Sequence, residues 1–208
     1  MTISGKELIT AGKSTAEIMI KSELELIESI RKKVNAAQKS PEGILGIGDD
    51  CAVYRISDGR FGLFSTDISV ENIHFDLSYT SLFNAGYRSM SANISDIYAM
   101  GGKPVLALVS AGIPEKFSEK DIAELYEGIL TCSNKYGVLI SGGDTSGSRE
   151  LIINIAIYGE SSSPVYRTGA KSGDRIYVTG STGLSQLGLE LLRNKPDEAG
   201  AYARPVFF

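Results

Sequence analysis

The stretch GIGDDCAVYRI, residues 46–56, decides how the rest of the chain is interpreted. It begins with two glycines around Ile47, continues with the adjacent carboxylates Asp49 and Asp50, and ends in residues typical of a strand. Adjacent carboxylates repel one another in apolar surroundings, so they need either a bound cation or a solvated turn. We interpret the stretch as a polar loop leading into a strand over 51–56, with the two acids as candidate metal ligands.

Three further aspartates lie at the polar end of an apolar or glycine-rich segment. Asp67 follows an apolar run, Asp96 lies inside a predicted helix, and Asp144 follows two glycines. Each could separately be a turn or surface residue, although a buried helical aspartate would need a cation or hydrogen-bond partners. Together, such oxygen ligands suit magnesium carrying a polyphosphate. The pattern predicts phosphoryl-transfer chemistry on a nucleotide.

Composition restricts the class of protein. The 208 residues are 42% hydrophobic and carry a formal net charge of -4, which argues against a general nucleic-acid binder. Cys51 and Cys132 form no ligand or redox motif and are expected to be free buried thiols rather than a disulfide. No apolar run is long enough to span a membrane, and the N-terminus is too polar for a signal peptide. We expect a cytoplasmic protein.

The apolar periodicity and the turn residues predict a mixed order of helices and strands. We expect helices over 22–37, 81–100, 119–136 and 183–192, and strands over 51–56, 62–66, 105–113, 138–141, 151–158 and 175–179, with a polar loop over 142–150. Their irregular alternation favours an α+β fold (α/β in the broad sense), with a mixed β-sheet flanked by helices.

A change of composition after Gly159 indicates a domain boundary, because Ser161-Ser162-Ser163-Pro164 is typical of a junction. We expect an N-terminal extension over 1–21, a first domain over 22–160, and the beginning of an incomplete second α/β domain over 161–208.

Two more residues are candidates for the site. A guanidinium binds phosphate oxygens bidentately, so Arg167 is the basic residue that we expect there, although a surface arginine at a junction is equally compatible. His74 is the only histidine. Residue chemistry alone favours a packed histidine of a strand or loop.

Five segments in this order resemble the thiamine-monophosphate kinases, within the superfamily named for aminoimidazole ribonucleotide synthetase. They are GIGDDCAVY (46–54), STDISVENIHF (65–75), SANISDIYAMGGKP (91–104), LISGGDTSGS (139–148) and YRTGAKSGDRIYVTGSTG (166–183). The resemblance covers about residues 22–206, and the combination of motifs is highly specific.

The resemblance implies the N-terminal domain of the aminoimidazole ribonucleotide synthetase-like fold, which forms a homodimer through its sheet. It implies several magnesium ions, ATP as co-substrate, and direct in-line transfer of the γ-phosphoryl group to thiamine monophosphate, without a covalent nucleophile on the enzyme. His74 matches a position near the thiamine phosphate.

The remaining site residues follow from the same resemblance. The positions matching metal ligands are Asp49, Asp50, Ser65, Thr66, Asp67, Asp96 and Asp144. The positions matching nucleotide-binding residues are Gly143, Asp144, Arg167 and Tyr126.

The resemblance also implies a longer protein, with a second acidic motif that these 208 residues lack, so we expect a C-terminally truncated piece. Two other functions stay open. One is a non-catalytic module that binds nucleotide and dimerises. The other is a sister ATP-dependent synthetase, although the reactive N-terminal cysteine or selenocysteine of selenophosphate synthesis is not visible here.

Overall fold

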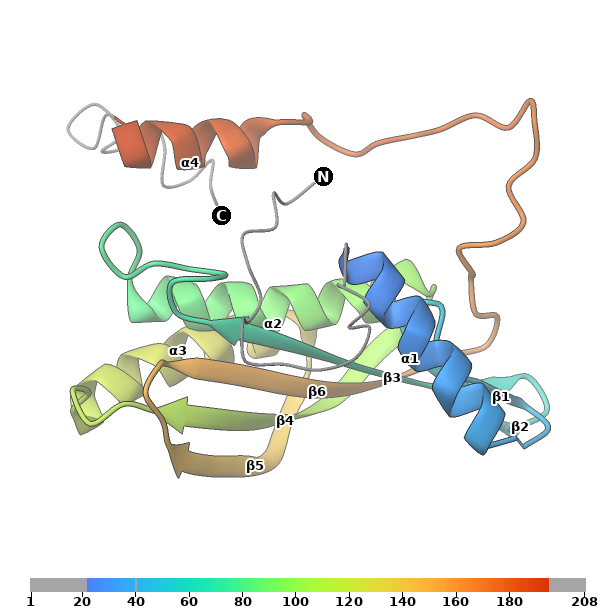
Figure 1. Ribbon diagram of the computed structural model, residues 1–208, viewed down its shortest axis with the longest axis horizontal. Helices are drawn as coiled ribbons and strands as arrows, with labels where there is room; N and C mark the ends of the chain where they lie inside the picture. The colour runs from blue at the N-terminus through green and yellow to red at the C-terminus, as the bar shows by residue number, and fades with distance from the viewer. Residues whose placement is uncertain (1–21, 40, 195–208) are drawn as a thin grey trace, which may run out of the picture.

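The computed structural model describes residues 22–39 and 41–194. The expected N-terminal extension, residues 1–21, lies outside them. The elements in chain order are α1 (Glu23–Ala37), β1 (Ile44–Leu45), β2 (Ala52–Ser57), β3 (Arg60–Val70), α2 (Leu82–Ala99), β4 (Lys103–Ile113), α3 (Glu119–Tyr136), β5 (Leu139–Gly147), β6 (Ile152–Ser161) and α4 (Leu184–Asn194). The expected α+β fold with a mixed sheet is confirmed (Figure 1).

One six-stranded sheet organises the domain, in the order β1-β2-β3-β6-β4-β5. The single parallel pair among these strands is β4 with β5, and α3 makes the crossover between them. The other neighbours are antiparallel. β6 therefore lies between β3 and β4, which it joins into one sheet.

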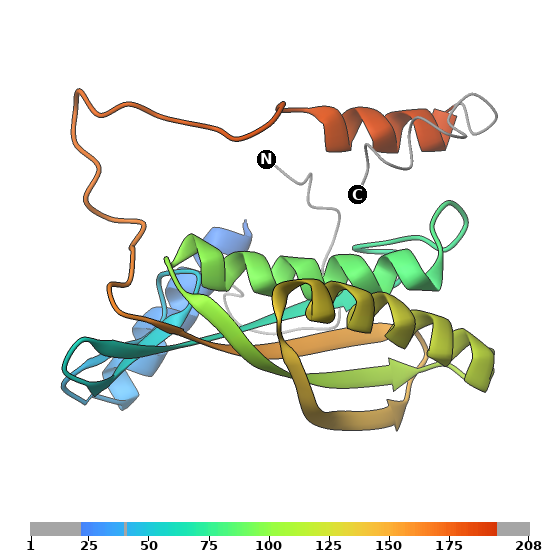
Figure 2. The ribbon, with the colours of Figure 1, turned by 180° about the vertical axis from the view of Figure 1, so that it is seen from behind.

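Helices α2 and α3 cover one face of this sheet (Figures 1 and 2). β6 buries Ile153, Ile155 and Ile157 toward them, as alternation along a strand requires. The two helices pack very closely: a Cβ on Gly86 of α2 would lie 2.1 Å from the carbonyl oxygen of Leu125 of α3. Glycine is needed there for close approach.

Local capping signals set the helix ends. The Ser22 hydroxyl accepts from the N–H of Glu25, and Ser81 does the same for Asn84. Ser118 and Asp121 form a reciprocal capping box at the start of α3. Gly137 ends that helix with a φ of 69°. These local signals explain why the three helices match their predicted ranges closely.

Three strand predictions need correction. The segment expected as a loop over 142–150 is extended through Gly147, because β4 supplies a parallel partner that the local composition does not reveal. β1 was not predicted, since two residues carry no periodicity. β3 extends to Val70, well past the predicted end at residue 66, because β6 pairs with it from Phe61 through Val70.

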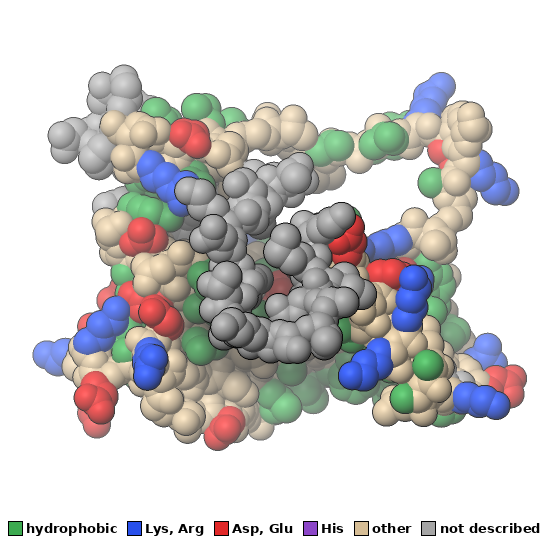
Figure 3. Space-filling view, viewed as in Figure 1, with side chains coloured by type: hydrophobic (Ala, Val, Ile, Leu, Met, Phe, Trp, Pro, Cys, Tyr) green, Lys and Arg blue, Asp and Glu red, His purple; other side chains and the backbone are tan. Residues whose placement is uncertain are grey.

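The strand predicted over 175–179 is wrong, because that segment has no regular secondary structure. Ile176, Tyr177 and Val178 are 94%, 81% and 65% exposed. Figure 3 shows hydrophobic side chains along this part of the chain, which leads to α4. The helix predicted over 183–192 is confirmed as α4, and its Leu192 packs against Tyr79.

The second face of the sheet is not covered by a described helix. Phe64, Ile68 and Leu108 point to it and are 48%, 50% and 44% exposed. The Phe64 ring lies between Tyr54 and Tyr158, with centroid distances of 5.6 and 4.9 Å. We call this surface the open face. Within the described part of the chain, no helix is both long and apolar enough to cross a membrane.

Candidate functional site

Ser65 and Asp67 of β3 face the α2 side of the sheet, because they pair with the buried residues Ile157 and Ile155 of β6. Asp96 comes to the same place from α2. The Ser65 hydroxyl donates to an Asp96 carboxylate oxygen at 2.5 Å. The fold therefore brings together residues 31 positions apart in the sequence.

Asn93 holds this arrangement and was missed by the sequence analysis. Its side chain is 1% exposed, and its amide oxygen accepts from the backbone N–H of Asp67 at 3.2 Å. Its amide nitrogen donates to the carbonyl oxygen of Ser89 at 2.9 Å. The signal was its position three residues before Asp96, which puts both side chains on one side of α2.

The electrostatics of Asp96 reflect a crowded acidic site. Burial raises the pKa of this carboxyl; the hydrogen bond from Ser65 lowers it, and the nearby carboxylates of Asp67 and Asp50 raise it. The same crowding acts on Cys51, whose thiol pKa is raised to about 12 by burial and then by Asp96, Asp50 and Asp49. Cys51 therefore stays a neutral thiol, and it donates weakly to the carbonyl oxygen of Asp96.

Arg167 binds the carboxylate pair at the end of the loop. Its backbone N–H donates to Asp49 at 3.1 Å, and its guanidinium donates to Asp50. Its Nε also lies 3.7 Å from a carboxylate oxygen of Asp49. The hydrogen bond to Asp50 raises the pKa of Arg167, so the guanidinium stays charged. Arg167, the predicted phosphate ligand, thus neutralises the predicted metal ligands Asp49 and Asp50, which lie 118 and 117 positions before it in the sequence.

Asp50, Ser65, Asp67 and Asp96 form what we call the carboxylate cluster. The side chains of Thr66 and Asp144 do not join it. The Thr66 hydroxyl bonds the Asn154 side chain at 3.1 Å on the open face. Asp144 lies on the edge strand β5, where it pairs with Ser110 of β4. Strands β4 and β6 lie between β5 and β3. Three strand spacings amount to roughly 14 Å. Within one chain, Asp144 is therefore remote from Asp67.

Gly143 and Tyr126 also lie away from the cluster. Gly143 has a φ of 157° and approaches the backbone of Val109 so closely that a Cβ would lie 1.7 Å from its carbonyl oxygen. Close packing of β5 against β4 therefore requires glycine at position 143, independently of any role in nucleotide binding. Tyr126 is a half-buried residue of α3 that packs on the core, and burial raises its pKa.

His74 lies in the turn that follows β3. Its Nδ1 accepts from the backbone N–H of Val70 at 3.0 Å, so in the neutral ring the proton is on Nε2. Arg88 donates to the carbonyl oxygen of His74. The exposed imidazole therefore presents a donor just beyond the end of the strand that contains Asp67, with Val70 roughly 10 Å from that residue.

No preformed metal centre is present in the described ranges 22–39 and 41–194, since no three histidine, cysteine, aspartate or glutamate side chains are arranged to hold an ion. The donor types nevertheless fit a hard divalent cation, because carboxylates and a hydroxyl converge there. Burial is the main cause of the raised pKa of Asp96, and such a cation would relieve the repulsion from Asp67 and Asp50 that adds to it.

Comparison with known proteins gives consistent results. The family model for "AIR synthase related protein, N-terminal domain" matches residues 48–161. Thiamine-monophosphate kinase of Bacillus subtilis is 36% identical over 167 residues, covering 79% of this chain and 51% of the relative. That of Methanocaldococcus jannaschii is 38% identical over 162 residues, covering 77% of this chain and 50% of the relative. The chain thus spans about half the length of these curated relatives.

A solved structure described as AaThiL complexed with AMPPCP and TMP is similar throughout the domain. Its TM-score is 0.81 and its sequence identity is 30%; the match covers 93% of this chain and 60% of that chain.

Proposed function

The chain belongs to the family of AIR synthase related proteins through its N-terminal domain, and we propose that it provides the ATP and magnesium site of a thiamine-monophosphate kinase. The reaction is in-line transfer of the γ-phosphoryl group of ATP to thiamine monophosphate, which gives thiamine diphosphate. The observation that carries this proposal is the convergence of Ser65 and Asp96, in the field of Asp67 and Asp50, on the α2 side of the sheet.

Asp50, Ser65, Asp67 and Asp96 are the proposed magnesium ligands, with Asp49 beside them. When bound, the ions neutralise phosphate charge and align the transferred group. The chain's own residues position them: Asn93 fixes the backbone at Asp67, and Ser65 orients the carboxylate of Asp96. Thr66 can contribute only through its backbone, since its hydroxyl bonds Asn154 on the opposite face.

Arg167 has two proposed states. Without nucleotide it neutralises Asp49 and Asp50. With nucleotide, the guanidinium binds phosphate oxygens, and the released carboxylates become available to magnesium. His74 is proposed to donate from Nε2 to the thiamine phosphate beyond the end of β3.

A homodimer through the open face is the second part of the proposal. Phe64, Ile68 and Leu108 form an exposed apolar surface of the kind that marks interfaces. Asp144 and Gly143, remote from the cluster in their own chain, would then serve the nucleotide site of a second copy. Tyr126 is proposed to contact the nucleotide at that shared site. We also propose a cytoplasmic location, consistent with the free thiols Cys51 and Cys132.

Calorimetric titration with magnesium and AMPPCP tests the site without requiring turnover by this half-length chain. Asp67→Asn should abolish measurable binding. Asp174→Asn, which removes a carboxylate that bonds the backbone of Lys171 in its own turn, should bind like the wild-type chain. Equal binding by the wild-type chain and the Asp67 variant would contradict the proposal. Adding thiamine monophosphate and ATP then tests turnover.

Sedimentation equilibrium tests the dimer. Phe64→Lys should yield a monomer, because a charge would be buried at the centre of the apolar surface. Tyr177→Lys, a matched change outside the open face, should leave the dimer intact. A wild-type chain that is monomeric at micromolar concentration would refute the interface.

A further inference from the structure

The turn that follows β3 is held in one conformation by several hydrogen bonds. Asn72 has a φ of 66°, in the left-handed region that asparagine tolerates, and its side-chain amide donates to a Glu150 carboxylate oxygen at 3.1 Å. The backbone N–H groups of Ile73 and His74 both donate to the carbonyl oxygen of Val70. These bonds set the direction of the His74 side chain, whose Nδ1 accepts from the N–H of Val70.

Glu71, the first residue of this turn, has a buried carboxylate, with only 6% of its side chain exposed. Its Oε1 accepts from the ammonium group of Lys116 at 2.7 Å, and its Oε2 accepts from the backbone N–H of Leu151 at 3.3 Å. Lys116 belongs to the loop between β4 and α3, and Leu151 is the residue before β6. A carboxylate removed from water needs such partners, and through them Glu71 ties the turn to two other parts of the chain.

The bond from Leu151 extends the pairing of β3 with β6 by one step. The last paired residues of the two strands are Val70 and Ile152. At the next position the backbone N–H of Glu71 donates to the carbonyl oxygen of Leu151 at 2.9 Å, but the N–H of Leu151 donates to the Glu71 side chain. The carboxylate thus takes the place of a strand carbonyl oxygen. The main chain can therefore turn away after Val70 without leaving a buried N–H unpaired.

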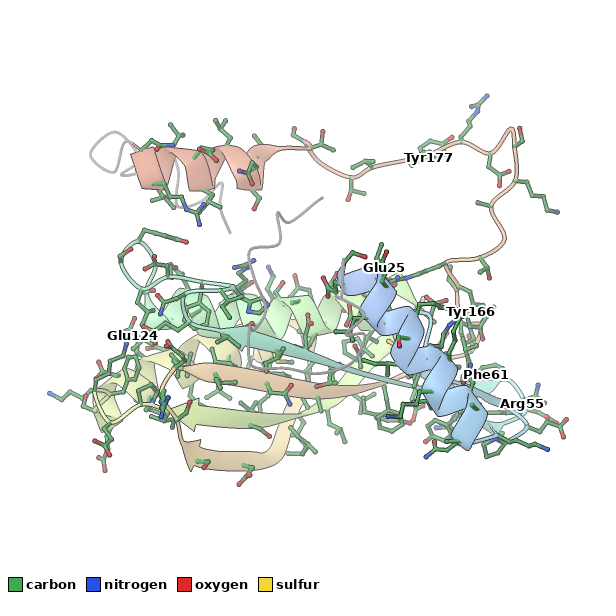
Figure 4. The ribbon with its side chains drawn as sticks, viewed as in Figure 1. Glu25, Arg55, Phe61, Glu124, Tyr166 and Tyr177 are labelled. Atoms are coloured by element: carbon green, nitrogen blue, oxygen red, sulfur yellow. The ribbon has the colours of Figure 1, made fainter. Side chains whose placement is uncertain are left out.

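The turn lies at the end of the molecule where α2 and α3 begin. In Figure 4, Phe61 near the beginning of β3 is at one end of the molecule and Glu124 of α3 is at the other. Glu124 accepts from the backbone N–H of Phe83 at 3.2 Å, at the start of the helix that follows the turn. Arg88 of the same helix donates to the carbonyl oxygen of His74. The turn is therefore tied to α2 as well as to the end of the sheet.

We propose that Glu71 is a positioning residue for His74: its carboxylate holds the turn so that Nδ1 stays bonded to the Val70 N–H and Nε2 faces the phosphate of the acceptor. The inference rests on the proposed role of His74 and extends it to a residue that acts through the imidazole. The bond from Leu151 is the essential one. Lys116 is 58% exposed and can turn into solvent, whereas the N–H of the fully buried Leu151 would be left unpaired.

The first test measures the hydrogen bond to the imidazole directly. His74 is the only histidine of the 208-residue chain, so the nitrogen resonances of its ring are unambiguous in an NMR spectrum. At about pH 9, where an ordinary imidazole is neutral, the N–H···N bond should give a nitrogen–nitrogen coupling between Val70 and Nδ1 of His74.

Three variants show whether Glu71 maintains that coupling. Glu71→Gln keeps the length of the side chain and an oxygen for the Leu151 N–H, so the coupling should remain. Glu71→Asp keeps the charge but is one methylene shorter, so the coupling should be lost. Glu115→Asp, the same change at an exposed residue of the loop before α3, should resemble the wild-type chain.

The second test measures the consequence for binding. Thiamine monophosphate is titrated into each chain, and the resonance of His74 Nε2 gives the affinity. Glu71→Asp should bind about tenfold more weakly, as expected when a hydrogen bond to a charged group is misdirected. Glu71→Gln and Glu115→Asp should bind like the wild-type chain.

The outcomes separate the two proposals. A wild-type chain whose Nε2 resonance does not respond to thiamine monophosphate overturns the proposed role of His74 and this inference with it. A wild-type response together with unchanged affinity in Glu71→Asp overturns only the inference. Loss of the coupling in Glu71→Gln also overturns it, because the bond from Leu151 would then not be what holds the turn. This last variant decides the question even if Glu71→Asp does not fold.

Discussion

Strand β6 and the segment 175–178 contain similar residues but differ in structure. Both contain isoleucine and tyrosine, which favour strands, and both were predicted to be strands. Ile155 in β6 is fully buried, between β3 and β4 and beneath the helices, whereas Ile176 is 94% exposed. The difference teaches that β-propensity is realised only where a neighbouring strand accepts the backbone hydrogen bonds and a layer covers the side chains.

The largest expected effect comes from truncating one isoleucine in each region. Ile155→Ala should lower the free energy of unfolding by about 4 kcal/mol, because it leaves a cavity in a closely packed core. Ile176→Ala should change it by less than about 0.5 kcal/mol. Urea unfolding of both variants measures the difference. Comparable losses would mean that the segment 175–178 is packed in solution, which would end the contrast.

A smaller effect is expected from a substitution at the contact between α2 and α3, the two helices that cover β6 but not the segment 175–178. Gly86→Ala would place a Cβ 2.1 Å from the carbonyl oxygen of Leu125. The clash should cost about 3 kcal/mol, against a gain of roughly 1 kcal/mol in helix propensity, so a net loss of about 2 kcal/mol is expected. Urea unfolding again gives the value.

Gly147→Ala is the control for that change. Gly147 has no left-handed φ, and a Cβ at this position would meet no atom within 4 Å. The free energy of unfolding should therefore change by less than about 0.5 kcal/mol. If Gly86→Ala stabilised the chain, the close packing of α2 on α3 would be refuted.

The smallest expected effect is a pH dependence at Asp96. Burial raises its pKa in the folded chain, so folding disfavours the ionised carboxylate. Its contribution to stability is therefore fully present below the pKa of the unfolded chain, near 4, and is lost as the pH rises through the folded pKa.

Relative to Asp96→Asn, the metal-free wild-type chain should consequently become less stable between about pH 4 and neutrality. The size is limited because the carboxyl is partly exposed and screened. Thermal unfolding of both chains across that range gives the difference. A wild-type chain that gains stability relative to the variant over this range would show that its surroundings favour the charged form.

The helices were predictable because their signals are local. Ser118 and Asp121, three residues apart, form the capping box that the sequence indicates, and Gly137 ends the helix. The strands depend on partners elsewhere in the chain. Gly142 and Gly143 are typical of a loop until β4 pairs with them, and no property of those two residues reveals that partner.

In the candidate site, too, some features could be predicted from the sequence and others depend on distant parts of the chain. The sequence indicated acidic residues at the polar ends of several segments, and in the fold Asp67 and Asp96 lie near each other because one face of β3 lies under α2; their role as metal ligands stays a prediction. The register of β5 and the alternation that turns the Thr66 hydroxyl to the open face could not be derived from motif spacing. Asn93 was overlooked because a buried amide that supports a backbone N–H resembles any polar helix residue.

The central position of β6 has a consequence for synthesis on the ribosome. The strand that bridges β3 to β4 is the last of the six to be translated. Until residue 161 has left the exit tunnel, the nascent polypeptide holds two half-sheets whose inner edges are unpaired and prone to aggregation. Protection by a chaperone, or rapid elongation through residues 139–161, would matter more for this protein than for one whose hairpins close in the order of their translation.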